Sequence, residues 1–164
     1  MAIAQTIADF LVDACVDYHV YPHQYAESAI DSARLTKLKP ETVAKAVVIA
    51  TKKHRKRTYC LVVVPADREV DLHNIRDIAY QDVELATESE LAVLFPDCEV
   101  GAIPALGEAY GLPTFIDKTI LASGQEIFFE AGDHQELIKI DAAQLATLMP
   151  YAELVSVSKK PTIQ

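Results

Sequence analysis

The chain has 164 residues and a formal net charge of −9, because its 24 Asp and Glu residues outnumber its 15 Lys and Arg residues. This length fits one domain, and a composition with 51% hydrophobic and 24% charged residues is typical of a folded globular chain, which excludes disorder and collagen-like structure. The acidic excess also excludes recruitment of nucleic acid by the overall field, since that field repels phosphate, so no DNA partner is expected and any RNA contact must be local.

The first part of the chain predicts a helix, a short strand and a second helix. Residues 2–16 repeat apolar side chains at helical spacing, which is typical of an amphipathic surface helix. Residues 18–21 have the composition of a strand that Pro22 stops, and residues 27–35 can form the second helix.

Two strongly apolar segments follow, at 43–50 and 58–64, and Lys45 is the one charged residue within them. Strands that are rich in valine and apolar on both faces belong in the middle of a sheet. The polar residues 51–57 are therefore predicted to form the tip of a hairpin between them.

The rest of the chain alternates helices and strands around an irregular loop. The predicted elements are a helix from Asp71 to Ile78, a helix capped by Thr87 that stops near Pro96, a loop over 100–113, strands over 114–116, 126–130 and 136–140, a turn over 132–134, a helix from Asp141 to about Met149 and a strand over 153–157. Because helices and strands are intermixed, the predicted fold class is α/β or α+β, with a mixed sheet surrounded by helices. We expect a single compact domain over residues 1–157 and a loose C-terminal tail over 158–164.

No segment predicts a membrane span or export. The longest apolar run, Cys60–Val64, is far shorter than the roughly 20 residues that a spanning helix needs, and the N-terminus has no basic start followed by an apolar run. Cys15, Cys60 and Cys98 form no CxxC pair, which indicates free thiols in a reducing compartment. The expected location is the cytoplasm.

Lys45 is the first candidate functional residue. Strand alternation places it on the same face as Val47 and Ile49, where an ammonium group is unfavourable unless it reaches water, an anion or a cavity. A side chain whose stem covers the strand and whose ammonium reaches water is one explanation. A cation inside a ligand pocket is the other.

The loop Gly101-Ala102-Ile103-Pro104-Ala105-Leu106-Gly107 is the second candidate. Glycine lets backbone N–H groups approach a ligand and proline holds a loop in one shape, which suits recognition of a carbonyl or phosphate group. An ordinary connection between a helix and a strand is the alternative. The chain has neither a Walker lysine nor a GxGxxG motif, so a nucleotide-binding fold is not supported.

Other patterns of reactive residues are weaker. His134 lies in a predicted turn, where it faces either a cavity or solvent. Cys15, His19 and His23 have the spacing of metal ligands, but Pro22 interrupts it and no second cluster completes a four-ligand site, so a metal site is not expected. The absence of a GxSxG motif disfavours covalent catalysis.

The predicted hairpin tip is strongly basic. It contains Lys52, Lys53, Arg55, Lys56 and Arg57. Such a run is usually a solvated turn, and it can also hold an RNA end through a few phosphate contacts.

Three motifs, in the same order along the chain, resemble the YbaK/EbsC family of editing domains associated with prolyl-tRNA synthetase. They are Pro40-x-x-x-x-Lys45-Ala46-Val47, Gly101-Ala102-Ile103-Pro104-x-x-Gly107 and Phe129-Glu130-Ala131-Gly132-Asp133-His134. The likeness covers roughly residues 5–150. It implies a mixed-sheet domain, either free-standing or inserted in a synthetase, that hydrolyses the ester joining a wrong amino acid to tRNA without a metal or cofactor.

The resemblance also implies roles for individual residues. Lys45 would bind the tRNA 3′ end and orient the ester, and Gly101 would belong to the backbone that holds the scissile carbonyl or the attacking water. The other implied substrate contacts are His23, Ser28, Ala46, Ala102, Ile103, Pro104, Gly107, Gly132 and His134. Ala105 replaces a proline that is frequent in the family, and Ala46 replaces the asparagine of alanine-specific members, so the amino acid stays open among Cys, Ala and Ser.

The function expected from these features is that of a trans-acting aminoacyl-tRNA deacylase, with aminoacyl-tRNA and a prolyl-tRNA synthetase as partners. A non-catalytic module that binds charged tRNA or a synthetase through the same pocket is the alternative. Hydrolysis of another small ester or amide by the same loop is a third reading.

Overall fold

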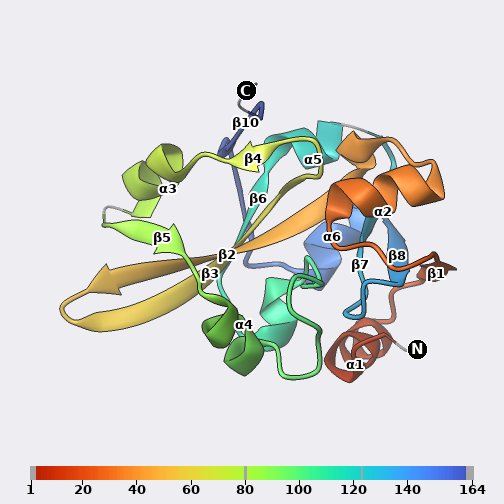
Figure 1. The fold of residues 1–164 in the computed structure, drawn as a ribbon, viewed down its shortest axis with the longest axis horizontal. Helices are drawn as coiled ribbons and strands as arrows, with labels where there is room; N and C mark the ends of the chain where they lie inside the picture. Colours follow the sequence, from red (N-terminus) through yellow and green to blue (C-terminus); the bar gives the residue numbers. More distant parts are fainter. Residues whose placement is uncertain (1–2, 80, 123, 162–164) are drawn as a thin grey trace.

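The computed structural model describes residues 3–79, 81–122 and 124–161. Within these ranges eight strands form one mixed sheet in the order β1-β8-β7-β2-β3-β6-β9, with β5 paired to β2 (Figure 1). These strands are β1 (His19–Pro22), β2 (Val43–Lys53), β3 (Lys56–Pro65), β5 (Val83–Leu85), β6 (Thr114–Asp117), β7 (Glu126–Glu130), β8 (Glu136–Asp141) and β9 (Glu153–Val155). Two further strands, β4 (Glu69–Val70) and β10 (Ser158–Lys159), pair with each other. The predicted fold class, a mixed sheet with intermixed helices, is confirmed.

Short helices connect these strands. They are α1 (Gln5–Asp13), α2 (Ala29–Thr36), α3 (Leu72–Ala79), α4 (Glu88–Leu94), α5 (Lys118–Ala122) and α6 (Ala142–Leu148), with 3-10 turns η1 (Pro40–Thr42) and η2 (Gly107–Tyr110). Helix α4 begins with the predicted capping box, in which the side chains of Thr87 and Glu90 each accept a hydrogen bond from the other residue's backbone N–H. In the described part of the chain, no helix combines the length and the apolar character that a membrane crossing requires.

Strands β2 and β3 form the long central hairpin, as predicted, but the strands run further than expected. Pairing continues to Lys53 and Lys56, so the turn is only His54 and Arg55. Their φ angles of 51° and 65° are those of a type I′ turn, which matches the twist of the two strands. The basic residues predicted for a loop therefore stand mostly on the ends of strands, in the hairpin that projects from the body in Figure 1.

Helices cover both faces of the sheet. On one face, α1 and α6 pack Leu11 and Leu145 around Phe129. On the opposite face, α2 packs around Phe128 and α3 contributes Ile75 to a separate cluster. Phe128 and Phe129 serve opposite faces because successive side chains of a strand alternate.

The sheet opens beside the middle of β2. One edge of β2 pairs with β3 over nearly its whole length, whereas the other edge pairs with β7 at Val43 and Ala44 and with β5 only from Ile49 onward. Lys45 lies in this opening. By alternation it shares the face of Val43 and Val47, which belong to the α2 and α3 clusters respectively, so its side chain leaves the sheet between them.

The end of the chain differs from the expected loose tail. Ser158 and Lys159 pair with β4, and the backbone N–H and hydroxyl of Ser158 both donate to the carboxylate of Asp117. Arg68 also donates from Nε to the Ser158 hydroxyl at 2.6 Å. The tail prediction was wrong for these two residues because contacts to distant segments hold them; residues 162–164 lie outside the described residues.

Several element boundaries also shift. Pro22 is the last residue of β1 and pairs with Glu136 at the edge of the sheet, where its missing N–H is tolerated. Helix α1 ends at Asp13, before Cys15 turns into the left-handed region at φ 54°, and the predicted start at residue 2 lies outside the described residues. Helix α2 begins at Ala29 because the hydroxyl of Ser28 caps it.

Candidate functional site

A cavity of about 280 Å³ occupies the opening beside β2. Its walls come from β2, the end of β7, the start of α2, the segment from the end of β5 into α4, and the loop after α4. The residues that matter for its chemistry are Ser28, Lys45, Ala46, Gly101, Ile103 and Glu130. Residues from five separate segments therefore meet in one place, and the two strongest sequence candidates, Lys45 and Gly101, are both among them.

Lys45 brings a cation to this cavity. Its Nζ donates to the carbonyl oxygen of Arg68 at 2.6 Å, which leaves two of its three N–H donors for other partners. Burial lowers the pKa of Lys45, while the carboxylates of Glu69 and Asp67 act in the opposite direction. The side chain is thus half-buried and anchored, and it lines the cavity rather than extending into bulk solvent.

The loop that contains Gly101 supplies backbone donors. The N–H of Ala102 donates to the carbonyl of Glu99 at 3.0 Å, whereas the N–H groups of Gly101 and Ile103 have no hydrogen-bond acceptor among the described residues. Gly101 has a φ of 87°, and a Cβ there would lie 3.3 Å from Cε1 of His134. The position therefore favours glycine, and the N–H groups of Gly101 and Ile103, on either side of the bonded N–H of Ala102, have no acceptor among the described residues.

Ala46 contributes backbone rather than side-chain chemistry. The carbonyl of Val48 accepts from the N–H of Ala86 on the open side of β2. Alternate residues of a strand direct their backbone groups to the same edge, so the N–H and carbonyl of Ala46 also face the opening. A methyl side chain at this position keeps the cavity wall apolar.

His134 supports the loop but does not line the cavity. Its ring is only 3% exposed, with Nδ1 2.9 Å from the carbonyl oxygen of Ala26 and Nε2 2.7 Å from that of Val100. A neutral imidazole can donate to only one of these oxygens, and the doubly protonated ring can donate to both. His134 thus joins the backbone of Ala26 to that of Val100, the residue before Gly101, and the structure does not place it in the cavity lining.

Other residues implied by the resemblance also serve the fold. A Cβ at Gly107 would collide with Oγ1 of Thr114, and one at Gly132 would lie 3.0 Å from Cβ of Ala4. Ala102 and Pro104 are buried and do not line the cavity. His23 lies in a different surface depression, with Nδ1 2.6 Å from the carbonyl oxygen of Gln24. These glycines are needed for close packing, and the structure does not bring His23 to the cavity.

Glu130 was not predicted as a site residue, yet it lines the cavity. It is 5% exposed, and its Oε1 accepts a hydrogen bond of 2.9 Å from the hydroxyl of Ser32. Burial raises the pKa of Glu130 to about 7, a shift that the Ser32 hydroxyl and His134 oppose and Asp133 supports. The sequence could have indicated this residue. Strand alternation places Glu130 on the same face as the apolar Phe128, so a charged side chain stands at an inward-facing position, as it does at Lys45.

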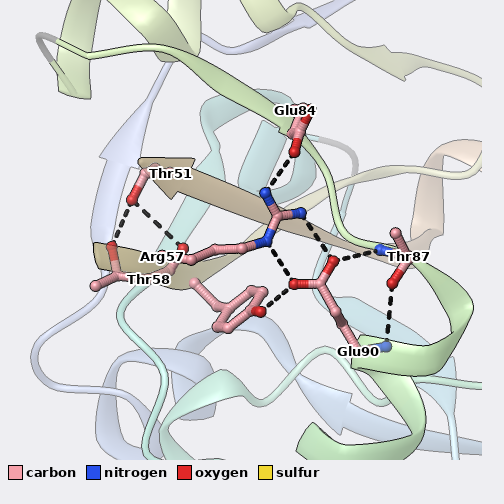
Figure 2. Close-up of polar contacts among 7 residues, drawn as sticks. Thr51, Arg57, Thr58, Glu84, Thr87 and Glu90 are labelled. Carbon is pink, nitrogen blue, oxygen red and sulfur yellow. Dashed lines mark hydrogen bonds and ion pairs between the residues drawn. The ribbon is translucent and has the colours of Figure 1, made fainter. Parts of the chain in front are cut away.

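On the hairpin, Arg57 is already paired (Figure 2). Its Nε and Nη2 donate to the two oxygens of Glu90 at 2.6 and 2.8 Å, and Nη1 donates to Glu84. The hydroxyl of Tyr59 also donates to Glu90, and these donors lower the pKa of that carboxylate. The guanidinium is therefore neutralised by acids, whereas Lys52, Lys53, Arg55 and Lys56 are exposed.

Two properties of the described residues bear on metals and thiols. No group of three or more His, Cys, Asp or Glu side chains within 3–79, 81–122 and 124–161 could share a metal ion. Burial raises the pKa of the Cys98 thiol to about 12 and that of Cys60 to about 11, which opposes thiolate formation.

A family model described as an aminoacyl-tRNA editing domain matches residues 23–148, which is more than half of the chain. The chain belongs to this family. The matched range contains Ser28, Lys45, Gly101 and Glu130, so the cavity lies within the editing domain. The membership predicted from three short motifs is confirmed, and it implies an aminoacyl-tRNA as the substrate.

Solved structures share the fold of this editing domain. The hypothetical protein APE2540 superposes with a TM-score of 0.81 and 16% identity over 94% of this chain and 100% of its own. A protein described as a proposed trans-editing enzyme for prolyl-tRNA synthetase superposes with a TM-score of 0.80 and 18% identity over 95% of this chain and 96% of its own. At these identities the likeness establishes the fold alone. No curated protein matches the sequence at a significant level.

Proposed function

We propose that this editing domain is a trans-acting deacylase that hydrolyses the ester of tRNA charged with a small wrong amino acid, such as cysteine, alanine or serine. The observation that carries the proposal is that Lys45, Gly101 and Ile103 line one cavity, and that the backbone N–H groups of Gly101 and Ile103 have no acceptor among the described residues. A cation suits the phosphate of a tRNA 3′ end, and paired N–H donors suit an ester oxygen.

The proposed reaction needs no side-chain nucleophile. Water adds to the ester carbonyl carbon, the bond from that carbon to the ribose oxygen breaks, and the leaving oxygen takes a proton that the vicinal ribose hydroxyl can relay. An aminoacyl ester is already activated, so preorganised donors at the developing oxyanion are effective, at about 3 to 4 kcal/mol for each donor in known enzymes. We assign this role to Gly101 and Ile103, and assign Lys45 to binding the 3′ end and orienting the ester.

The dimensions of the cavity suggest how substrates are selected. A space of about 280 Å³ walled by Ala46 and Ile103 suits a short side chain, with the adenosine outside it. An apolar pocket distinguishes ligands by about 1 to 3 kcal/mol per methylene, which is why a synthetase benefits from a second, hydrolytic selection step. We propose that this step takes place in the cytoplasm. We also propose a prolyl-tRNA synthetase as the partner, because a protein of the same fold is described as a proposed trans-editing enzyme for that synthetase.

The direct test is incubation of the purified protein with Cys-tRNA, Ala-tRNA and Ser-tRNA. We expect ester loss from at least one of them well above the spontaneous rate, and little from tRNA carrying a larger amino acid such as leucine. Small non-RNA esters serve as the control for the third reading of the sequence. Binding of charged tRNA without any hydrolysis would replace the deacylase by a non-catalytic module.

The hairpin is proposed as a secondary tRNA contact. Changing Arg55 and Lys56 together to alanine is expected to weaken tRNA binding and to reduce the slope of log affinity against log salt by roughly 1 to 2, because each phosphate contact contributes just under 1. Affinity would be measured between 50 and 200 mM salt. The matched control changes Lys39 and Lys118, which are also exposed, and equal losses in the two double variants would assign the effect to net charge alone.

A further inference from the structure

A buried carboxyl group in the cavity wall lacks half of its hydrogen bonds. Oε1 of Glu130 accepts from Ser32, but Oε2 is buried and has no hydrogen-bond partner among the described residues. A buried carboxylate oxygen without a partner is strongly unfavourable, so such a group usually has a ligand, a water molecule or an ion opposite it. Because Glu130 lines the cavity, a molecule bound there can supply that partner.

The protein itself provides no close cation. No ion pair within 4.0 Å joins Glu130 to a Lys, Arg or His side chain in the described ranges, although His134 is near enough to favour the charged carboxylate. The ammonium of Lys45 is held by the carbonyl of Arg68 and by the field of Asp67 and Glu69. The opposite charges in this cavity are therefore separated rather than paired.

The topology fixes this separation. The pairing between β2 and β7 ends at Ala44 and Phe129. Lys45 and Glu130 are the next residues of the two strands, and their side chains lie on the same face of the sheet. The two strands diverge at that point, and the side chains reach different segments, Lys45 the β3–β4 connection and Glu130 helix α2. A ligand between them meets a cationic side chain at one end and a carboxyl group at the other.

We propose that Glu130 recognises the α-ammonium group of the esterified amino acid, so that the site accepts aminoacyl esters with a free amine and excludes those with a blocked one. This inference rests on the proposed function. The polarity of the cavity fits an aminoacylated 3′ end, which carries its negative charge on phosphate and its positive charge on the amine. An α-amino group has a pKa of about 7.7 to 8.0 and is substantially charged at neutral pH. Glu27 also lines the cavity, but it is exposed, so water already satisfies it.

The test uses two analogues that cannot lose an ester, namely adenosine with a 3′-alanylamide and the same compound N-acetylated. Isothermal titration at pH 7.5 is expected to give at least about tenfold tighter binding of the free amine by the native chain. Glu130→Gln should remove that preference while leaving affinity for the N-acetylated analogue within about twofold. The matched control is Glu126→Gln, at the exposed start of the same strand, which should keep the preference.

Each other result overturns the proposal. Equal binding of both analogues by the native chain, no binding of either, or an equal loss for both in Glu130→Gln would show that this residue does not read the amine. A normal amine preference in Glu130→Gln with slower hydrolysis would assign it to the chemical step instead. Failure of the proposed function is a separate outcome: amine preference and its loss in Glu130→Gln would persist, while no charged tRNA would be hydrolysed.

Discussion

Replacing Lys45 with alanine is expected to lower kcat/KM for the hydrolysed aminoacyl-tRNA by on the order of 100-fold. The Lys45 side chain lines the cavity, its ammonium makes one hydrogen bond among the described residues, and a hydrogen bond to a charged group is worth about 1.5 to 3 kcal/mol. The free energy of unfolding should change little, because the ammonium is desolvated and, among the described residues, its hydrogen-bond acceptor is the carbonyl of Arg68. Single-turnover deacylation and urea denaturation on the same preparation measure the two quantities.

The controls separate charge from volume. Lys45→Met keeps the apolar stem without the ammonium and should be as inactive as the alanine variant, whereas Lys39→Ala removes an exposed lysine and should be as active as the native chain. A Lys45→Ala protein with native kcat/KM would remove the residue from the site. Equal loss of activity and of folding stability would make its role structural.

The position of Lys45 could be predicted because the signal is local. A single lysine within the apolar run 43–50 is costly unless something compensates it, and the structure supplies a cavity and a carbonyl acceptor. Gly101 was predicted for a similar reason, because glycine and proline together restrict the backbone of a loop, and the structure places Gly101 in the cavity lining. The mixed sheet and the central strands predicted over 43–50 and 58–64 also followed from apolar runs and turn residues, although the structure extends these strands to 43–53 and 56–65.

The remaining features depend on long-range pairing that no local pattern encodes. The cavity exists because β7 and β5 pair with different ends of β2, and β7 lies more than seventy residues further along the chain. His134 was singled out by its predicted turn and by the resemblance, whereas its contacts are to the carbonyls of Ala26 and Val100, which are distant from it in the sequence. In the sequence Arg57 belongs to a basic run, but in the fold it forms ion pairs with Glu84 and Glu90, which are distant from it along the chain.

Glu130→Gln is expected to make the protein more stable at pH 8, and progressively less so as the pH falls. The folded pKa of Glu130, about 7, lies above its ordinary value of 4.5, so the fold favours the protonated acid. Stability from that preference is complete below about pH 4.5 and is lost as the pH rises through 7, which amounts to about 3 kcal/mol at 1.36 kcal/mol per pKa unit. Asp133 raises this pKa further, and Ser32 and His134 lower it.

The measurement is urea denaturation of the native chain and the variant at several pH values between 5 and 8, compared as a difference so that other acids cancel. Glu126→Gln, which replaces a carboxylate at the exposed start of the same strand, is the matched control. A difference for Glu130→Gln that does not change with pH, or that changes only as much as that of the control, would contradict the buried charge. If the stability difference changes with pH as expected, Glu130 destabilises the native fold at neutral pH. A group that lowers stability is typical of a residue kept for a ligand, which we propose is a cationic amine.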